Sequence, residues 1–121
     1  MNAIDPSVIA DESTGKWWMH YGSFFGGLYC VELNPETGLV LNEGDWGHLV
    51  ARRANYRKDN LEAPEIIYHP ELKQYYLFTS YDPLMTTYNV RVSRSDAAEG
   101  PFTDYLGKAV KDKTNNFPIL T

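Results

Sequence analysis

The feature that most constrains the fold of this chain is an internal repeat with an offset of 58 residues. Segment 2–9 (NAIDPSVI) is matched by segment 60–67 (NLEAPEII), with Pro6 aligned to Pro64 (64 − 6 = 58). Two later runs repeat at the same or nearly the same offset, 16–20 with 74–78 and 31–33 with 90–92. Repeats of this length made of short aromatic strands are typical of β-propeller blades. The sequence therefore predicts an all-β chain in which each repeat is one blade.

Turn residues separate the short runs of β-forming residues. The expected strands are 7–10, 17–22, 28–33, 39–41 and 48–51 in the first unit, and 65–68, 75–81 and 89–95 in the second. No extended apolar period of 3.6 residues is present, so helices are expected only as short turns, around Ala97 and at 55–58. We predict two four-stranded antiparallel blade-like units, at about 2–57 and 60–107, followed by an inter-blade connector at 108–121.

Two blades cannot close a ring, because each blade needs a neighbour to cover its faces. The chain is therefore expected to be an incomplete propeller. Its exposed faces and strand edges favour self-association.

Composition and charge exclude several classes of partner. The formal net charge is −5, which argues against binding to nucleic acid, since phosphates need a clustered excess of Lys and Arg. No apolar run approaches the roughly 18 residues that span a bilayer, so no membrane partner is expected. The first five residues carry neither a basic nor an apolar segment and predict no signal peptide. The single cysteine, Cys30, lies in an apolar strand and is expected to be a small buried side chain.

Each repeat places one carboxylate at the entry of its first strand, Asp5 in the first and Glu62 in the second. First strands line the central channel of a propeller, so these positions in adjacent blades are expected to lie near each other. Two neighbouring carboxylates in a partly desolvated cleft can differ in proton affinity, as cleavage of a glycosidic bond requires. The alternative is that both are solvated residues at strand entries.

Other carboxylates compete for the same role. They are Asp59, Glu65 and Asp82. Glu65 lies three residues after Glu62 with a proline between them, and is expected to point to the opposite side of the strand or nearly so.

Segment 21–27 (YGSFFGG) is rich in aromatic residues and glycine and follows a strand. Glycines let the backbone approach a ligand closely, and Phe rings offer apolar faces to sugars. The alternative is an ordinary turn with one buried Phe.

Two other chemistries are not supported by the sequence. The three histidines show no close ligand spacing, and with one cysteine they make no zinc pattern. Ser23 has no Gly-x-Ser-x-Gly context, which argues against a serine hydrolase.

Four ordered motifs together resemble glycoside hydrolase family 43, and within it the endo-1,5-α-L-arabinanase branch. They are NAIDP (2–6), YGSFFGG (21–27), LEAP (61–64) and YNVRVSRS (88–95), and the resemblance covers about residues 2–107.

The resemblance implies a five-bladed β-propeller and an inverting hydrolase of arabinan or arabino-oligosaccharides. On this pattern Glu62 matches the general acid, and Asp5 matches the aspartate that tunes and orients the acid. The general base matches a position in an earlier blade that this sequence does not contain. Asn2, Ser23 and Phe24 match positions near the bound sugar.

The resemblance also bears on cofactors and location. The family often carries calcium in the central channel, near a histidine of a later blade, so no metal and no other cofactor is expected in this chain. The intact protein is expected to be secreted or periplasmic.

Two alternatives remain beside the enzyme fragment. One is a non-catalytic propeller module that self-assembles or binds glycan. The other is the same acid acting on a related furanoside.

Overall fold

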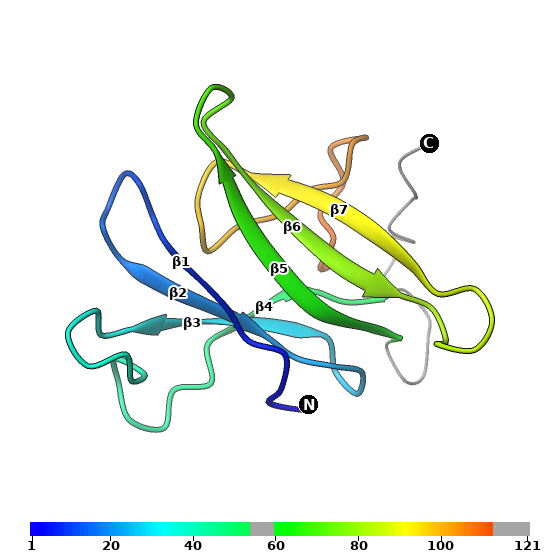
Figure 1. Cartoon of the computed structure of the whole chain (residues 1–121), viewed down its shortest axis with the longest axis horizontal. Coiled ribbons are helices and arrows are strands. Elements are labelled where there is room, and N and C mark those ends of the chain that lie inside the picture. The colour runs from blue at the N-terminus through cyan, green and yellow to red at the C-terminus, as the bar shows by residue number, and fades with distance from the viewer. Residues whose placement is uncertain (54–59, 113–121) are drawn as a thin grey trace.

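The structure is a computed structural model that describes residues 1–53 and 60–112. Its described part contains seven strands and no helix. The strands are β1 (Ser7–Ala10), β2 (Trp17–Tyr21), β3 (Leu28–Leu33), β4 (His48–Ala51), β5 (Leu61–His69), β6 (Gln74–Tyr81) and β7 (Asn89–Ser95). They form two antiparallel sheets with the orders β1-β2-β3-β4 and β5-β6-β7 (Figure 1). The predicted all-β class is confirmed.

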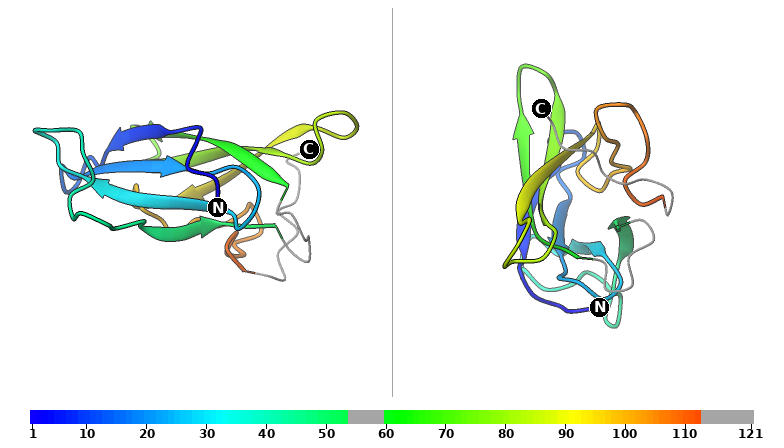
Figure 2. Two further views of the ribbon diagram at one scale, coloured as in Figure 1. Left: turned by 90° about the horizontal axis from the view of Figure 1, so that it is seen from below. Right: turned by 90° about the vertical axis from the view of Figure 1, so that its right-hand side faces the viewer.

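Each sheet is a meander in which every strand pairs with the next one along the chain. The first three strands of the two sheets correspond in order: β1 to β5, β2 to β6 and β3 to β7. The two sheets lie side by side, and β1, β2 and β3 all contact β5 (Figures 1 and 2). The 58-residue repeat of the sequence is therefore a repeat of the structural unit.

Three details differ from the sequence-based expectation. Residues 39–41 form no strand, and Val40 makes only an isolated bridge to Leu33. The second sheet has three strands in the described part of the chain, where Thr103 reaches the fourth position through a single bridge to Arg94. The expected helical turn at Ala97 is a hydrogen-bonded turn closed by Gly100, whose N–H donates to the Ala97 carbonyl over 3.1 Å.

Other expectations fall wholly or partly outside the described residues. These are the helical turn at 55–58 and most of the connector at 108–121.

The main apolar core lies between the two sheets. Alternate residues of β2 and β3 face it, including Trp18, Leu28 and Cys30, and the second sheet contributes Ile66 and Leu77. The thiol of Cys30 is fully buried, and burial raises its pKa, so the expected buried and unpaired cysteine is confirmed.

Two buried polar side chains fasten the turn after β7 to the first sheet. The carboxylate of Asp11 accepts a hydrogen bond from the Ala98 N–H over 2.9 Å, and the Nε2–H of His20 donates to the Ala98 carbonyl over 2.8 Å. Both side chains are almost completely buried. A buried polar group is stable only where it is hydrogen bonded, so these contacts fix the register of one sheet against the other.

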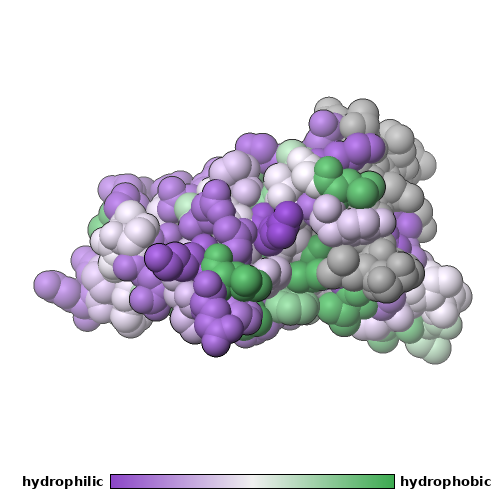
Figure 3. Space-filling view, turned by 90° about the horizontal axis from the view of Figure 1, so that it is seen from above, coloured by the Kyte–Doolittle hydropathy of each residue, from purple (hydrophilic) through white to green (hydrophobic). Residues whose placement is uncertain are grey.

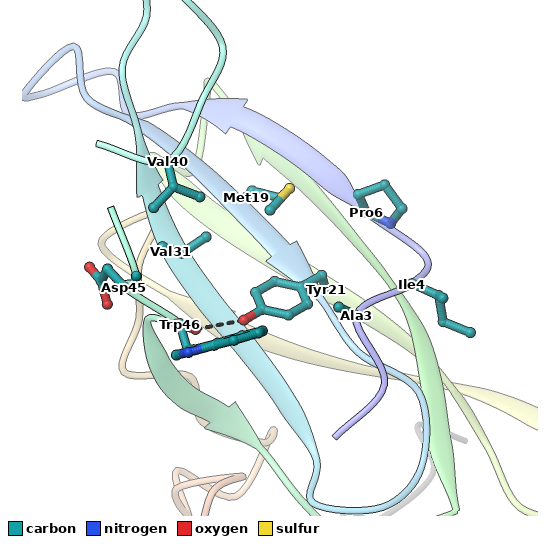
Figure 4. A pocket seen from close by; sticks show the side chains of 10 residues that line it. Ala3, Ile4, Pro6, Met19, Tyr21, Val31, Val40, Asp45 and Trp46 are labelled. Atoms are coloured by element: carbon teal, nitrogen blue, oxygen red, sulfur yellow. Dashed lines mark hydrogen bonds between the residues drawn. The ribbon is translucent and has the colours of Figure 1, made fainter. Parts of the chain in front are cut away.

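The outer face of the first sheet carries a second, smaller apolar cluster around Tyr21, Val31 and Leu33. A pocket of about 420 Å³ opens on this face, and the Tyr21 hydroxyl closes one side by donating to the Trp46 carbonyl over 2.6 Å (Figure 4). Hydrophobic side chains also reach the surface as patches among mostly hydrophilic ones (Figure 3). No helix in the described ranges is long and apolar enough to span a membrane.

Candidate active site

The segment after β2 joins the entries of the two sheets. The N–H of Gly22 donates to the Ile4 carbonyl over 3.0 Å, and the N–H of Phe24 donates to the Leu61 carbonyl over 3.0 Å. Ser23 lies between these two bonds and forms an isolated antiparallel bridge with Glu62. Asp5 and Glu62 follow directly after the two acceptor residues, so the segment brings the entries of β1 and β5 to one end of the molecule.

Glycine is required in this segment for steric reasons. A Cβ at Gly22, where φ is +132°, would lie 2.8 Å from the Gly27 carbonyl oxygen. At Gly27, where φ is +90°, it would lie 2.5 Å from the Ala51 carbonyl oxygen. The loop can therefore pass close to its neighbours only because both positions lack a side chain.

A β-bulge shapes the start of β5. Glu62 pairs with Ser80 and Glu65 pairs with Phe78, so three steps along β5 match two along β6. Ala63, inside the bulge, has a φ of +50°. Bulges of this kind re-aim side chains and are frequent beside active sites.

The bulge corrects the expectation for Glu65. Directly opposite residues of an antiparallel pair share a face, and Ser80 and Phe78 are two residues apart on β6. Glu62 and Glu65 therefore lie on the same face of β5. The prediction that Glu65 points to the opposite side or nearly so was wrong, because the bulge adds one residue to β5 between them.

Each carboxylate oxygen of Glu62 accepts one hydrogen bond from a hydroxyl. Ser23 Oγ donates to Oε2 over 3.0 Å, and Tyr88 Oη donates to Oε1 over 2.6 Å. Ser23 is 3% exposed, whereas Tyr88 is 41% exposed. One oxygen of Glu62 is thus held from inside the protein and the other from the solvent side.

The charge of Asp5 also influences Tyr88. The pKa of Tyr88 is raised, first because its hydroxyl is partly buried, then because it donates to Glu62, and further by the charges of Glu62 and Asp5. The carboxylates of the two repeats, Asp5 and Glu62, thus both raise the pKa of the same tyrosine.

Strained backbone also gathers at this end of the two sheets. Among the described residues other than glycine, five of the six positive φ angles occur here, at Asp5 (57°), Phe24 (52°), Phe25 (44°), Ala63 (50°) and Asp82 (73°), and the sixth is at Lys73 (51°) in the β5–β6 turn. Such conformations cost about 1–3 kcal/mol each and cluster at functional sites, where surrounding contacts hold them. Their concentration supports a site here.

Other candidate residues have different surroundings. Phe24 is half-buried beside Phe25, with ring centroids 6.2 Å apart, and Phe25 is 55% exposed. Asn2 is half-buried in the segment before Asp5. The loop therefore presents one exposed ring and one half-buried ring, which is compatible with both readings of segment 21–27.

The competing carboxylate Asp82 has charged partners of its own. It forms an ion pair with Arg53, and Arg91 lies 4.0 Å from its other oxygen. The two guanidinium groups lie over the Tyr81 ring, at 4.4 Å for Arg53 and 3.7 Å for Arg91. Asp82 thus belongs to a cluster with Arg53, Arg91 and Tyr81 and does not share the contacts of Glu62. Asp59 lies outside the described residues.

Among the residues that the structure describes, no group of three or more His, Cys, Asp or Glu side chains could hold a metal ion. His20 and His48 instead donate to the backbone carbonyls of Ala98 and Glu99, each over 2.8 Å.

The apolar pocket in Figure 4 contains neither Glu62 nor Ser23 in its lining. It is lined by the outer face of the first sheet, by the segment before β1 and by the loop at 44–46. Because the contacts of Glu62 with Ser23 and Tyr88 lie outside this pocket, we assign the candidate site to the Glu62 end of the sheets.

Tyr88 was not singled out from the sequence. Its position just before a strand placed it at the correct end of the β6–β7 hairpin, but no local pattern indicated that its hydroxyl meets Glu62.

The geometry describes two blades of a β-propeller that share a carboxylate site at one end, an arrangement suited to acid–base hydrolysis. Residues 1–118 match the glycosyl hydrolases family 43, and the chain belongs to this family. Two extracellular endo-α-(1→5)-L-arabinanases are similar in sequence, one from Thermotoga petrophila (41% identity, 99% of this chain, 25% of the relative) and endo-arabinanase 2 from Bacillus subtilis (38%, 92% and 23%).

Solved structures show the same likeness. The endo-1,5-α-L-arabinanase from Thermotoga petrophila superposes with a TM-score of 0.81 at 39% identity, covering 92% of this chain and 24% of that one. The Cellvibrio cellulosa α-L-arabinanase complexed with arabinohexaose gives a TM-score of 0.77 at 32% identity, covering 92% and 38%. These neighbours are β-propellers, so the predicted fold is confirmed, and the chain spans about a quarter of the length of the first relatives it matches.

Proposed function

We propose that this chain is the part of an arabinan-cleaving glycoside hydrolase that carries the general acid, Glu62. The observation that carries the proposal is the position of Glu62 where the two blades meet, with Ser23 of one blade bound to its Oε2. Family membership and the similarity to named arabinanases support α-1,5-linked arabinan or arabino-oligosaccharides as substrate.

In this proposal Glu62 donates a proton to the leaving glycosidic oxygen. Asp5, at the equivalent entry of the first blade, is proposed to tune and orient this acid. In an inverting enzyme a second carboxylate on the opposite side of the sugar activates water, at about 6.5–9.5 Å from the acid. That general base comes from another blade, so residues 1–121 alone should hydrolyse arabinan little or not at all.

Three further residues are proposed to contact the sugar. Asn2 lies in the segment before Asp5, Phe24 follows Ser23 in the segment after β2, and Ser23 orients Glu62 from the buried side. The half-buried ring of Phe24 suits packing against the C–H face of a sugar. We propose secretion of the intact enzyme, because the relatives are named as extracellular proteins.

A graft tests the proposal. Residues 1–118 replace the matching segment of the Thermotoga petrophila arabinanase, and the hybrid is assayed on linear arabinan. We expect cleavage by the hybrid, and a loss of about 100-fold or more with Glu62→Gln, because general acid catalysis contributes about 10²–10⁴-fold. Undiminished turnover by the Glu62→Gln hybrid would refute the assignment. Assaying the hybrid on other furanoside polysaccharides tests the choice of substrate.

A second candidate function is a non-catalytic module that self-assembles or binds glycan. It is favoured by apolar side chains on the outer faces of both sheets, where Val8 is 48%, Ile67 43% and Val90 59% exposed. A propeller covers such faces with neighbouring blades, so a second copy of the chain could cover them instead.

A further inference from the structure

We propose that Tyr88 is a positioning residue that holds the Oε1 atom of the acid and fixes the plane of its carboxyl group. This inference rests on the proposed role of Glu62. The β6–β7 loop thereby helps to position the acid, because Tyr88 ends that loop.

The two hydroxyl groups that donate to Glu62 each hold a different oxygen of its carboxyl group. The Ser23 contact comes from a 3% exposed residue in a backbone bridge and cannot easily be displaced. With Oε2 alone held, the carboxyl group could still rotate about its Cγ–Cδ bond, since terminal sp³–sp² torsions are broad. The 2.6 Å bond from Tyr88 to Oε1 supplies the second fixed point. A general acid must aim its proton at the leaving oxygen, so a fixed carboxyl plane raises the fraction of time that Glu62 spends in the reactive geometry.

The loop that carries Tyr88 is anchored at its base rather than free. Asn89 Nδ2 donates to the Thr87 carbonyl over 2.7 Å, and Arg91 Nε donates to Asn89 Oδ1 over 2.9 Å. The Asp82 N–H at the other end of the loop donates to the Asn60 carbonyl over 2.9 Å. Arg91 is 9% exposed and its guanidinium lies 3.7 Å from the centre of the Tyr81 ring. A buried cation thus sets the position of Asn89, which sets the backbone next to Tyr88.

A phenol suits both charge states of the acid. A protonated carboxyl keeps acceptor capacity beside its one O–H, so Tyr88 can go on donating to Glu62 while the carboxyl proton faces the leaving oxygen. Like any phenol of ordinary pKa, Tyr88 is protonated at neutral pH, and its pKa is raised further. Phenylalanine would fill the same space without this hydrogen bond, which makes Tyr88→Phe the informative change.

The kinetic test uses the hybrid arabinanase and two leaving groups. Tyr88→Phe should lower kcat on arabinan about tenfold, since a hydrogen bond to the carboxylate that forms as Glu62 gives up its proton is lost. It should lower the rate on an arabino-oligosaccharide with a 4-nitrophenol leaving group less than about twofold, because that leaving group needs little protonation. The matched control is Tyr105→Phe, which removes the hydroxyl of a 51% exposed tyrosine beyond β7 and should change neither rate. Equal losses on both substrates, or no loss on arabinan, would overturn the inference.

The Glu62→Gln hybrid separates this inference from the proposed function. If that variant fails to discriminate between the two substrates, Glu62 is not the acid and the proposed function fails. If it discriminates strongly while Tyr88→Phe does not, only the role of Tyr88 fails.

A second measurement needs no activity and uses residues 1–121 as they are. NMR titration of ¹³C-labelled tyrosine should show that Glu62→Gln lowers the pKa of Tyr88, because an anionic acceptor is removed. An unchanged pKa of Tyr88 would contradict the contact itself.

Discussion

At the residue scale, two buried titratable groups on the first sheet determine how the two sheets respond to acid. Asp11 accepts hydrogen bonds from Ala98 and from Ser13 and Thr14 of its own turn. Burial alone would raise the pKa of Asp11, but these bonds outweigh it and lower the pKa from 3.8 to about 2. Burial of the His20 ring lowers the pKa of this group from 6.5 to about 4.

Asp11→Asn should destabilise the chain by about 2 kcal/mol at pH 7, because the folded protein loses a carboxylate that it binds better than the unfolded chain does. The folded-state pKa is the lower one, so this contribution is present above pH 3.8 and is lost as the pH falls towards 2. Urea unfolding at several pH values measures the difference. Glu71→Gln, at an exposed carboxylate in the β5–β6 turn, is the control and should change stability by less than about 0.5 kcal/mol. A constant difference between pH 7 and pH 2 would show that Asp11 acts through packing instead.

His20 predicts a loss of stability at higher pH than Asp11. The unfolded chain binds a proton below pH 6.5, whereas folded His20 stays neutral until about pH 4, so stability should fall by about 3 kcal/mol across that window. His20→Gln keeps a donor for the Ala98 carbonyl and should flatten this slope, while His69→Gln should leave it intact. The same slope in all three proteins would contradict the assignment.

At the element scale, the loop between β2 and β3 decides where Ser23 meets Glu62. Gly22→Ala should destabilise the chain by about 3 kcal/mol, since the new methyl group meets the Gly27 carbonyl and the backbone angle is unfavourable. Gly15→Ala is the matched control, because Gly15 also has a positive φ (+72°) but nothing within 4 Å of an added Cβ. Its cost should be about 1 kcal/mol. Equal unfolding midpoints for the two variants would contradict the steric argument.

The sequence predicted these elements unevenly. Strands such as β3 and β7 were found because short runs of β-forming residues between turn residues are local signals. The bulge in β5 was missed because Ala63 gives no local sign of a positive φ, and the direction of Glu65 was wrong as a result. The contact between Tyr88 and Glu62 joins residues 26 positions apart through a loop whose course no short-range rule fixes.

At the scale of the whole molecule, the sheets present apolar side chains on their outer faces. We expect residues 1–121 to self-associate, and Val90→Lys on β7 to weaken the association, because Val90 is 59% exposed beside other apolar groups of the same face. Light scattering over a range of concentrations measures this. Thr86→Lys, in the adjoining exposed loop, adds the same charge away from the sheet and is the control. A monomeric wild-type chain at all concentrations would leave the second candidate function without support.

The proposed function requires that Glu62 reach the glycosidic bond that is cleaved. The direct measurement is a crystal structure of the Glu62→Gln hybrid arabinanase with an arabino-oligosaccharide bound. We predict that an oxygen or nitrogen of the substituted side chain lies about 3 Å from a glycosidic oxygen, with Ser23 and Tyr88 still beside it. A sugar bound with every glycosidic oxygen beyond hydrogen-bonding reach of position 62 would contradict the central claim.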